Sequence, residues 1–217
     1  MGRTRTKICG ITRHQDLQAV LAAGADAVGF VFYPPSPRFI DLERAAGLSA
    51  AVPAFVSRVG RFVNAEPGTV RDTLSAVPLD LLQFHGDEDE AYCRQFGRPY
   101  IKAARVRADL DLLECARAFP TASGLLLDAY VEGYGGGGRR FDWSLVPAEL
   151  PLPVILSGGL DSGNVEEAIR ALRPWAVDVS SGVEQSKGVK DAARIAAFMA
   201  AVKRADEAAG AMGDADT

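Results

Sequence analysis

Short apolar runs alternate with Ala-, Leu- and Arg-rich stretches along almost the whole chain. Typical runs are Asp26–Phe32, Phe55–Val63 and Leu79–His85, and the first two are followed by helix-start residues, Asp41 and Pro67. Runs without regular polar residues are typical of parallel strands covered on both faces. About eight strand–helix pairs of roughly 25 residues each fit into the 217 residues, near the low end for a closed barrel. The pattern therefore predicts an α/β fold, a single-domain (β/α)8 TIM barrel.

An open, doubly wound sheet is the competing architecture for such an alternation. Against it, no G-x-G-x-x-G motif opens a helix after the first expected strand, Thr6–Gly10. No linker interrupts the pattern, and the closing helix is expected over Lys190–Lys203. We therefore expect one catalytic domain over residues 1–205, and a disordered Ala/Gly/Asp-rich tail over residues 206–217.

Charge and residue usage exclude several classes of partner. A formal net charge of −4 argues against nucleic acid or an anionic membrane as the main partner, and no apolar run approaches the roughly 20 residues that span a bilayer. Three cysteines without a C-x-x-C pair, behind a polar N-terminus, indicate free thiols in the cytoplasm. With only two histidines, His14 and His85, we do not expect a His-rich metal site.

The active site of a (β/α)8 barrel lies at the carboxyl ends of its strands. Two Ser/Gly runs end the seventh and eighth expected strands: Ser157, Gly158 and Gly159, and then Ser180, Ser181 and Gly182. Glycines let a phosphate approach backbone N–H groups, and serine hydroxyls add donors. Either run alone would be an ordinary turn. Barrels often hold phosphate at the loops after the seventh and eighth strands, and here both loops carry such a run. The two runs together therefore predict a phosphorylated small-molecule substrate.

Cys9 and Asp128 end the first and sixth expected strands. A cysteine on an apolar strand is more often inert, but Lys7 lies on the same face, and a nearby ammonium favours the thiolate. Asp128 follows three leucines, so it either caps a turn or performs chemistry. Burial would raise the pKa of Asp128 and hold it protonated as a general acid.

Other polar residues at the expected strand ends are candidates for substrate binding. Arg38, in a proline-rich loop, suits a bidentate contact with a carboxylate or phosphate, although it could also be merely solvated. Gln83 and Asp178 lie at the ends of the fourth and eighth expected strands. His85 has two interpretations, as a substrate contact or as a brace for the end of its strand.

Seven motifs, in order between Lys7 and Lys203, resemble the phosphoribosylanthranilate isomerase family. They are Lys7-Ile-Cys-Gly-Ile-Thr12, Gly24-Ala-Asp-Ala-Val-Gly-Phe-Val-Phe32, Ser36-Pro-Arg38, Gln83-Phe-His-Gly86, Gly135-Gly with Phe141-Asp-Trp143, Leu156-Ser-Gly-Gly-Leu160 and Val177-Asp-Val-Ser-Ser-Gly-Val-Glu184. The first and last motifs together are specific, whereas S-G-G alone would be weak.

The resemblance implies an Amadori rearrangement of N-(5′-phosphoribosyl)anthranilate in tryptophan biosynthesis, without a cofactor. It implies that Cys9 is the general base, that Asp128 is the general acid, and that Arg38 holds the anthranilate carboxylate. The two Ser/Gly runs would hold the phosphate, and the Gly135–Gly138 loop could cover the substrate. Two loop positions depart from the family pattern: Gly137 stands where Thr or Ser is usual, and Lys187 where Pro is common.

Three other functions stay open at this point. A related barrel, aminoimidazole-carboxamide ribotide isomerase, would use two aspartates and two phosphate grips, whereas here the first strand ends in Cys9 and one pair of phosphate-type loops is found. A catalytically silent phosphate-binding barrel would need an inert Cys9. A thiol redox role would need a resolving cysteine, which the sequence does not indicate. We expect a monomer, with a homodimer as the alternative.

Overall fold

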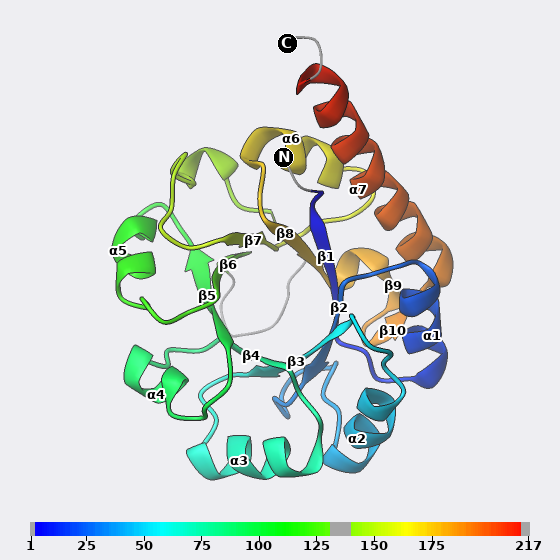
Figure 1. Ribbon diagram of the computed structural model, residues 1–217, viewed down its shortest axis with the longest axis vertical. Coiled ribbons are helices and arrows are strands. Elements are labelled where there is room, and N and C mark those ends of the chain that lie inside the picture. Colours follow the sequence, from blue (N-terminus) through cyan, green and yellow to red (C-terminus); the bar gives the residue numbers. More distant parts are fainter. Residues whose placement is uncertain (1–2, 131–139, 214–217) are drawn as a thin grey trace.

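Eight parallel strands close into a barrel in the computed structural model, which describes residues 3–130 and 140–213 (Figure 1). Each strand pairs with the next along the chain, and β8 pairs with β1, which closes the ring and rules out an open sheet. The strands are β1 (Arg5–Cys9), β2 (Ala27–Val31), β3 (Ser57–Phe62), β4 (Leu81–Phe84), β5 (Tyr100–Val106), β6 (Gly124–Ala129), β7 (Val154–Leu156) and β8 (Ala176–Val179). The predicted (β/α)8 barrel is confirmed.

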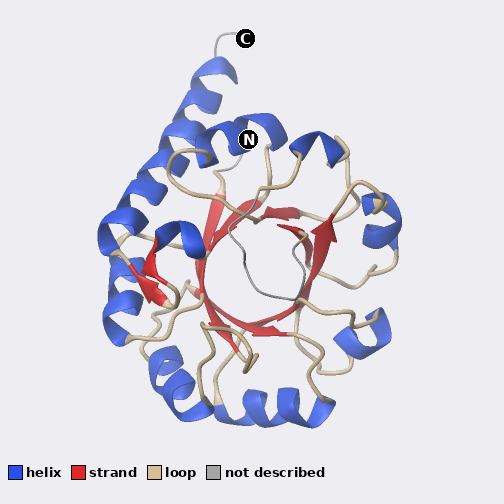
Figure 2. Cartoon of the chain, turned by 180° about the vertical axis from the view of Figure 1, so that it is seen from behind, coloured by secondary structure: helices blue, strands red, loops and turns tan. Residues whose placement is uncertain are grey.

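Helices surround the barrel on its outside (Figure 2). They are α1 (His14–Ala22), α2 (Leu42–Ala50), α3 (Pro67–Ala76), α4 (Glu90–Arg94), α5 (Leu112–Arg117), α6 (Val165–Leu172) and α7 (Ala192–Gly213). Short 3-10 turns, η1 (Trp143–Leu145) and η2 (Ser181–Val183), follow β6 and β8, and a hairpin of β9 (Glu184–Ser186) and β10 (Val189–Lys190) precedes α7. None of the helices within the described ranges is long and apolar enough to cross a membrane.

Aspartates fix where three of the helices begin. The side chains of Asp41, Asp89 and Asp111 each accept a hydrogen bond from a backbone N–H in the first turn of α2, α4 and α5. Such caps satisfy donors that the first turn of a helix leaves unpaired. Pro67 occupies the first turn of α3, where its missing N–H costs nothing.

Strand alternation divides the core into two layers. On β6, Leu125 and Leu127 belong to the large cluster between strands and helices, whereas Leu126 belongs to a separate cluster with Ile101 and Ile155. Neighbouring residues on a strand face opposite sides, so the smaller cluster fills the interior of the barrel. Asp128, two residues beyond Leu126, therefore faces the interior as well, nearer the carboxyl end of the strand.

The structure corrects two expectations at the C-terminal end. Lys190, expected in the closing helix, belongs to β10, and the helix begins at Ala192. The same helix continues to Gly213, so the expected disorder from Asp206 is wrong for residues 206–213. Asp206 accepts hydrogen bonds from the backbone and hydroxyl of Thr4, which ties this part of the helix to the barrel. The predicted Gly135–Gly138 loop lies outside the described residues.

Candidate active site

A polar pocket lies at the carboxyl ends of the barrel strands. Its walls are formed by Cys9, Val31, Arg38, Arg61, Gln83, His85, Asp128, Ala129, Ser157, Gly158, Gly159, Leu160, Asp178, Val179, Ser180 and Ser181. These include every site residue expected from the sequence except Gly182. Gly182 packs against Leu160, which is itself one of the lining residues. Residues from seven of the eight strand ends, all except that of β5, thus line one pocket.

Cys9 lies beside a buried ion pair. Lys7, on the same face of β1, places its Nζ 2.9 Å from Asp178 Oδ1 on the neighbouring strand β8. Burial lowers the pKa of Lys7, but the Asp178 carboxylate and the Cys9 sulfur outweigh it, so the pKa lies above its usual value. Gly29 makes room for the sulfur, since a Cβ there would come within 2.8 Å of Cys9 Sγ. The cysteine therefore stands next to an ammonium that stays charged.

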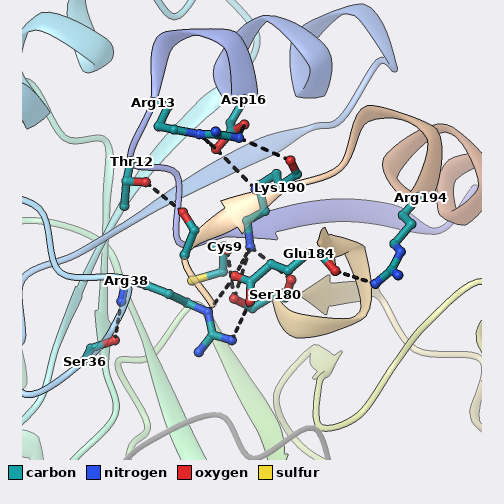
Figure 3. A network of polar contacts seen from close by, with 11 residues as sticks. Cys9, Thr12, Arg13, Asp16, Ser36, Arg38, Ser180, Glu184, Lys190 and Arg194 are labelled. Carbon is teal, nitrogen blue, oxygen red and sulfur yellow. Dashed lines mark hydrogen bonds and ion pairs between the residues drawn. The ribbon is translucent and has the colours of Figure 1, made fainter. Parts of the chain in front are cut away.

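A second charged cluster joins the loop after β2 to the β9–β10 hairpin (Figure 3). Arg38 donates from Nε to Glu184 Oε1 at 2.8 Å and from Nη2 to Oε2 at 2.9 Å. Lys190 Nζ lies 2.9 Å from the same Glu184 Oε1. Burial raises the pKa of Glu184, but the two cations outweigh it and hold that pKa below its usual range. One carboxylate thus faces two buried cations. It occupies Nε and Nη2 of Arg38, the pair of donors that the sequence suggested for a bidentate contact with a ligand.

Ser180 links this cluster to Cys9. Its Oγ donates to the Cys9 carbonyl oxygen at 2.9 Å, and its own carbonyl accepts from Lys190 Nζ at 3.0 Å. The hydroxyl proton of Ser180 is therefore already engaged, and the peptide carbonyl at the end of β1 is held in place by the loop after β8.

Asp128 forms a third group with two residues of the β4 end. His85 Nε2 lies 3.1 Å from Asp128 Oδ2, and His85 Nδ1 lies 3.0 Å from Gln83 Nε2. Burial raises the pKa of Asp128, but the hydrogen bond from His85, the Arg61 guanidinium and the Ala129 N–H outweigh it. The pKa of Asp128 therefore lies below its usual value, and the expectation of a raised pKa is wrong. Burial alone would raise this pKa, and the donors around the carboxylate reverse the direction.

The two Ser/Gly turns pack against each other at the pocket wall. Gly158 and Gly159 adopt φ of +84° and +66°, the left-handed region that favours glycine. A Cβ on Gly182 would overlap the carbonyl oxygen of Leu160, so only glycine lets the two turns approach this closely. Asn164 braces the first turn by donating from Nδ2 to the Gly159 carbonyl at 2.9 Å.

Charge in and around the pocket favours an anionic ligand. Its cations are Lys7, Arg38, Arg61 and Lys190, and its carboxylates are Asp128, Asp178 and Glu184. Four cations thus face three carboxylates beside turns suited to phosphate. Across residues 3–130 and 140–213, no group of three or more His, Cys, Asp and Glu could hold a metal ion.

Three of the charged residues were not expected from the sequence. Arg61 lies on β3 and pairs in register with Gln83, and its signal is a charge within an apolar run. Glu184 and Lys190 reach the site through the hairpin after β8. Glu184 ends the Val177–Glu184 motif, so that motif carried the available signal.

The closed parallel barrel and the charged pocket at its carboxyl end define the chain as a (β/α)8-barrel enzyme. Residues 6–201 match the family model of N-(5′-phosphoribosyl)anthranilate isomerase. The chain belongs to the phosphoribosylanthranilate isomerase family, whose members are isomerases of tryptophan biosynthesis.

Individual relatives are similar over nearly their full length. The N-(5′-phosphoribosyl)anthranilate isomerase of Dechloromonas aromatica is 62% identical over 205 residues, which cover 94% of this chain and 99% of the relative. A solved isomerase in complex with reduced 1-(o-carboxyphenylamino)-1-deoxyribulose 5-phosphate is 41% identical, with a TM-score of 0.83 and coverage of 93% and 99%. A structure of monomers generated from the dimeric Thermotoga maritima enzyme is 40% identical, with a TM-score of 0.81 and coverage of 92% and 98%.

Proposed function

We propose that the chain converts N-(5′-phosphoribosyl)anthranilate to 1-(o-carboxyphenylamino)-1-deoxyribulose 5-phosphate, with Cys9 as general base and Asp128 as general acid. The observation that carries this proposal is that Cys9 and Asp128, from strands β1 and β6, line one pocket together with both Ser/Gly turns. Because the thiol and the carboxyl come from strands at different places around the barrel, they can act on different atoms of one bound sugar.

The substrate carries an anionic group at each end, and the pocket offers a cationic or polar contact for each. The turns at Ser157–Gly159 and Ser180–Gly182 would hold the phosphate. Arg38 would hold the anthranilate carboxylate with Nη1, the nitrogen that Figure 3 shows pointing away from Glu184. The relative solved with a reduced product analogue, which bears both a carboxyphenyl group and a phosphate, supports this arrangement.

The reaction begins when protonated Asp128 gives its proton to the ribose ring oxygen. The bond between that oxygen and C1′ breaks, its electron pair goes to oxygen, and the nitrogen lone pair forms a Schiff base. The Cys9 thiolate then takes the proton from C2′, which the iminium makes acidic, and an enolamine results. The enolamine becomes the ketone when C1′ gains a proton from the Cys9 thiol and the C2′ hydroxyl loses its proton to Asp128, which returns both groups to their starting states. Because bound phosphate and carboxylate add negative charge, they would raise the pKa of Asp128 from its value in the unliganded site.

Separate substitutions of the two residues test these roles. Cys9→Ala and Asp128→Ala should each lower kcat by on the order of 10²–10⁴, because each removes one proton transfer, while inorganic phosphate still binds. The assay is the fluorescence loss of phosphoribosylanthranilate, run for the wild type with and without iodoacetamide. Cys115→Ala, at the partly buried cysteine of α5, is the matched control and should leave kcat unchanged. Near-full turnover by either site variant would remove its assigned role.

The domain organisation, assembly and location are further parts of the proposal. We propose a single catalytic domain, which the one continuous ring of eight strands supports. The three free cysteines support a reducing, cytoplasmic location. For assembly we propose a monomer, with a homodimer as the alternative, because both dimeric and monomeric forms exist for the Thermotoga maritima relative. Light scattering at micromolar concentration would distinguish the two forms.

A further inference from the structure

Gln83 carries a buried polar atom without a partner. Its side chain is 1% exposed at the end of β4, and Oε1 is one of two buried side-chain polar atoms, within residues 3–130 and 140–213, that lack a hydrogen bond. The other side of the amide is used, because Nε2 lies 3.0 Å from His85 Nδ1. A buried acceptor without a partner is destabilising, and a methionine of similar size would avoid it. The feature therefore points to a use for the amide N–H.

The amide fixes which nitrogen of His85 carries the proton. An amide nitrogen can only donate, so His85 Nδ1 must accept, and a neutral ring then carries its proton on Nε2. Nε2 lies 3.1 Å from Asp128 Oδ2, so it donates to that carboxylate oxygen. The three side chains form a directed chain of hydrogen bonds from β4 to β6, in which Gln83 sets the direction.

The surrounding charges keep the ring neutral but do not choose its tautomer. Burial, and the neighbouring cations Arg61 on β3 and Lys102 on β5, outweigh Asp128 and lower the pKa of His85 to about 4. Two charged groups from other parts of the barrel, Asp178 on β8 and the Arg38 guanidinium, also interact electrostatically with the Asp128 carboxylate. Since both neutral tautomers carry the same net charge, the hydrogen bonds at the two ring nitrogens decide between them.

We propose that Gln83 is a positioning residue, which holds His85 as the Nε2–H tautomer so that the imidazole stabilises the carboxylate that Asp128 becomes when it releases its proton. The inference rests on the proposed role of Asp128 as the general acid. In that step the O–H bond of Asp128 breaks at Oδ1, the proton goes to the ribose ring oxygen, and the negative charge remains on the carboxylate. Oδ2 receives the His85 donor throughout the step.

The geometry around Asp128 leaves Oδ1 for the substrate. Oδ1 accepts from the Ala129 N–H at 2.9 Å and lies 3.0 Å from where a Cβ of Gly158 would stand, at the pocket wall. Were His85 the Nδ1–H tautomer, the lone pair on Nε2 would face the Asp128 carboxylate. That repulsion would make Asp128 a weaker acid at the moment of proton transfer.

Nitrogen-15 NMR of ring-labelled histidine tests the tautomer directly. The chain has two histidines, and His14→Asn at the exposed start of α1 leaves His85 as the one labelled ring. In this background we expect Nε2 to carry the proton and Nδ1 to be bare around neutral pH. With Gln83→Glu the new carboxylate accepts, so Nδ1 should gain a proton. With Gln83→Met, which offers no donor, the fraction of the Nε2–H tautomer should fall.

Steady-state kinetics separate a positioning role from substrate binding. Both Gln83 variants should lower kcat by roughly 10-fold or more, since acid catalysis is weakened, while KM stays within about two-fold. Gln18→Met, at an exposed position of α1, is the control and should change neither constant. Circular dichroism of each variant confirms that it is folded.

Each result either supports or overturns the inference. An Nδ1–H ring in the unsubstituted Gln83 background overturns it, as does a tautomer that both variants leave unchanged. A raised KM at constant kcat assigns Gln83 to substrate binding instead. A changed tautomer at unchanged kcat also removes the positioning role. Failure of the proposed function looks different, because Asp128→Ala then keeps its turnover while the tautomer of His85 still follows Gln83.

Discussion

Replacing Glu184 by glutamine tests the charge balance of the pocket most directly. The Glu184 carboxylate accepts from Arg38 through two nitrogens and from Lys190 Nζ, and its side chain is 4% exposed. An amide keeps one acceptor but places an NH2 group against a donor and leaves two buried cations without a counter-charge. Breaking a buried ion pair by removing one partner costs about 3–5 kcal/mol. At about 2–4 °C per kcal/mol for a chain of this size, Glu184→Gln should lower Tm by roughly 6–20 °C.

Thermal unfolding followed by circular dichroism measures this loss. Glu166→Gln, which removes an exposed pair with Arg170 and Arg204, is the control and should cost at most about 1 kcal/mol. Since the pKa of Glu184 is lowered on folding, its stabilisation is complete above its ordinary value of 4.5 and is lost as pH falls through the lower, folded value. The Tm difference should therefore shrink in acid. At about 2–4 °C per kcal/mol, a shift of less than about 2 °C corresponds to at most about 1 kcal/mol. A Tm of Glu184→Gln that close to the wild type at neutral pH would refute the reasoning.

Two further substitutions address ligand binding. Arg38→Ala should chiefly raise KM, with a smaller effect on kcat, because Arg38 is expected to bind the substrate carboxylate rather than to move a proton; an unchanged KM in steady-state assays would count against that contact. Gly182→Ala should weaken the binding of inorganic phosphate by on the order of 10-fold, because the new Cβ overlaps Leu160 and forces the two turns apart. Gly47→Ala in α2, where a Cβ meets nothing within 4 Å, is the control, and equal phosphate affinity in both variants by calorimetry would contradict the prediction.

The sequence predicts the barrel well because several of its strands, such as β2, β6 and β7, are short and mostly apolar runs. Leu125–Leu127 needs no partner to be recognised as a buried strand, and a carboxylate directly after it must lie at the strand end. The same logic places Cys9 and the Ser/Gly turns in one pocket, since all carboxyl ends of a closed parallel barrel meet on one side.

The electrostatics of the site could not be predicted in this way, because they depend on contacts between distant segments. Arg38 and Glu184 are 146 positions apart, and the partner that lowers the pKa of Asp128 comes from β4. No periodicity along the chain specifies which charges meet in the barrel mouth. Burial alone therefore predicts the wrong direction for the pKa of Asp128.

The errors at the C-terminal end have a similar cause. A hairpin of strands only three and two residues long has too little pattern to be separated from the helix that follows, so the sequence predicts the wrong element for Lys190. The tail composition favours disorder, but Asp206 is held by Thr4, 202 positions earlier.

The link between Thr4 and Asp206, with the pairing of β1 and β8, has a consequence for synthesis on the ribosome. The first strand, β1, can pair with β2 early, but its second neighbour, β8, is made last of the eight barrel strands. Cys9 contacts Ser180, and through it the Glu184–Lys190 cluster, only when the final quarter of the chain has emerged. A nascent chain that stops before β8 thus has a cysteine but no assembled site around it. The surroundings of Cys9 are therefore complete only when the two ends of the polypeptide have come together.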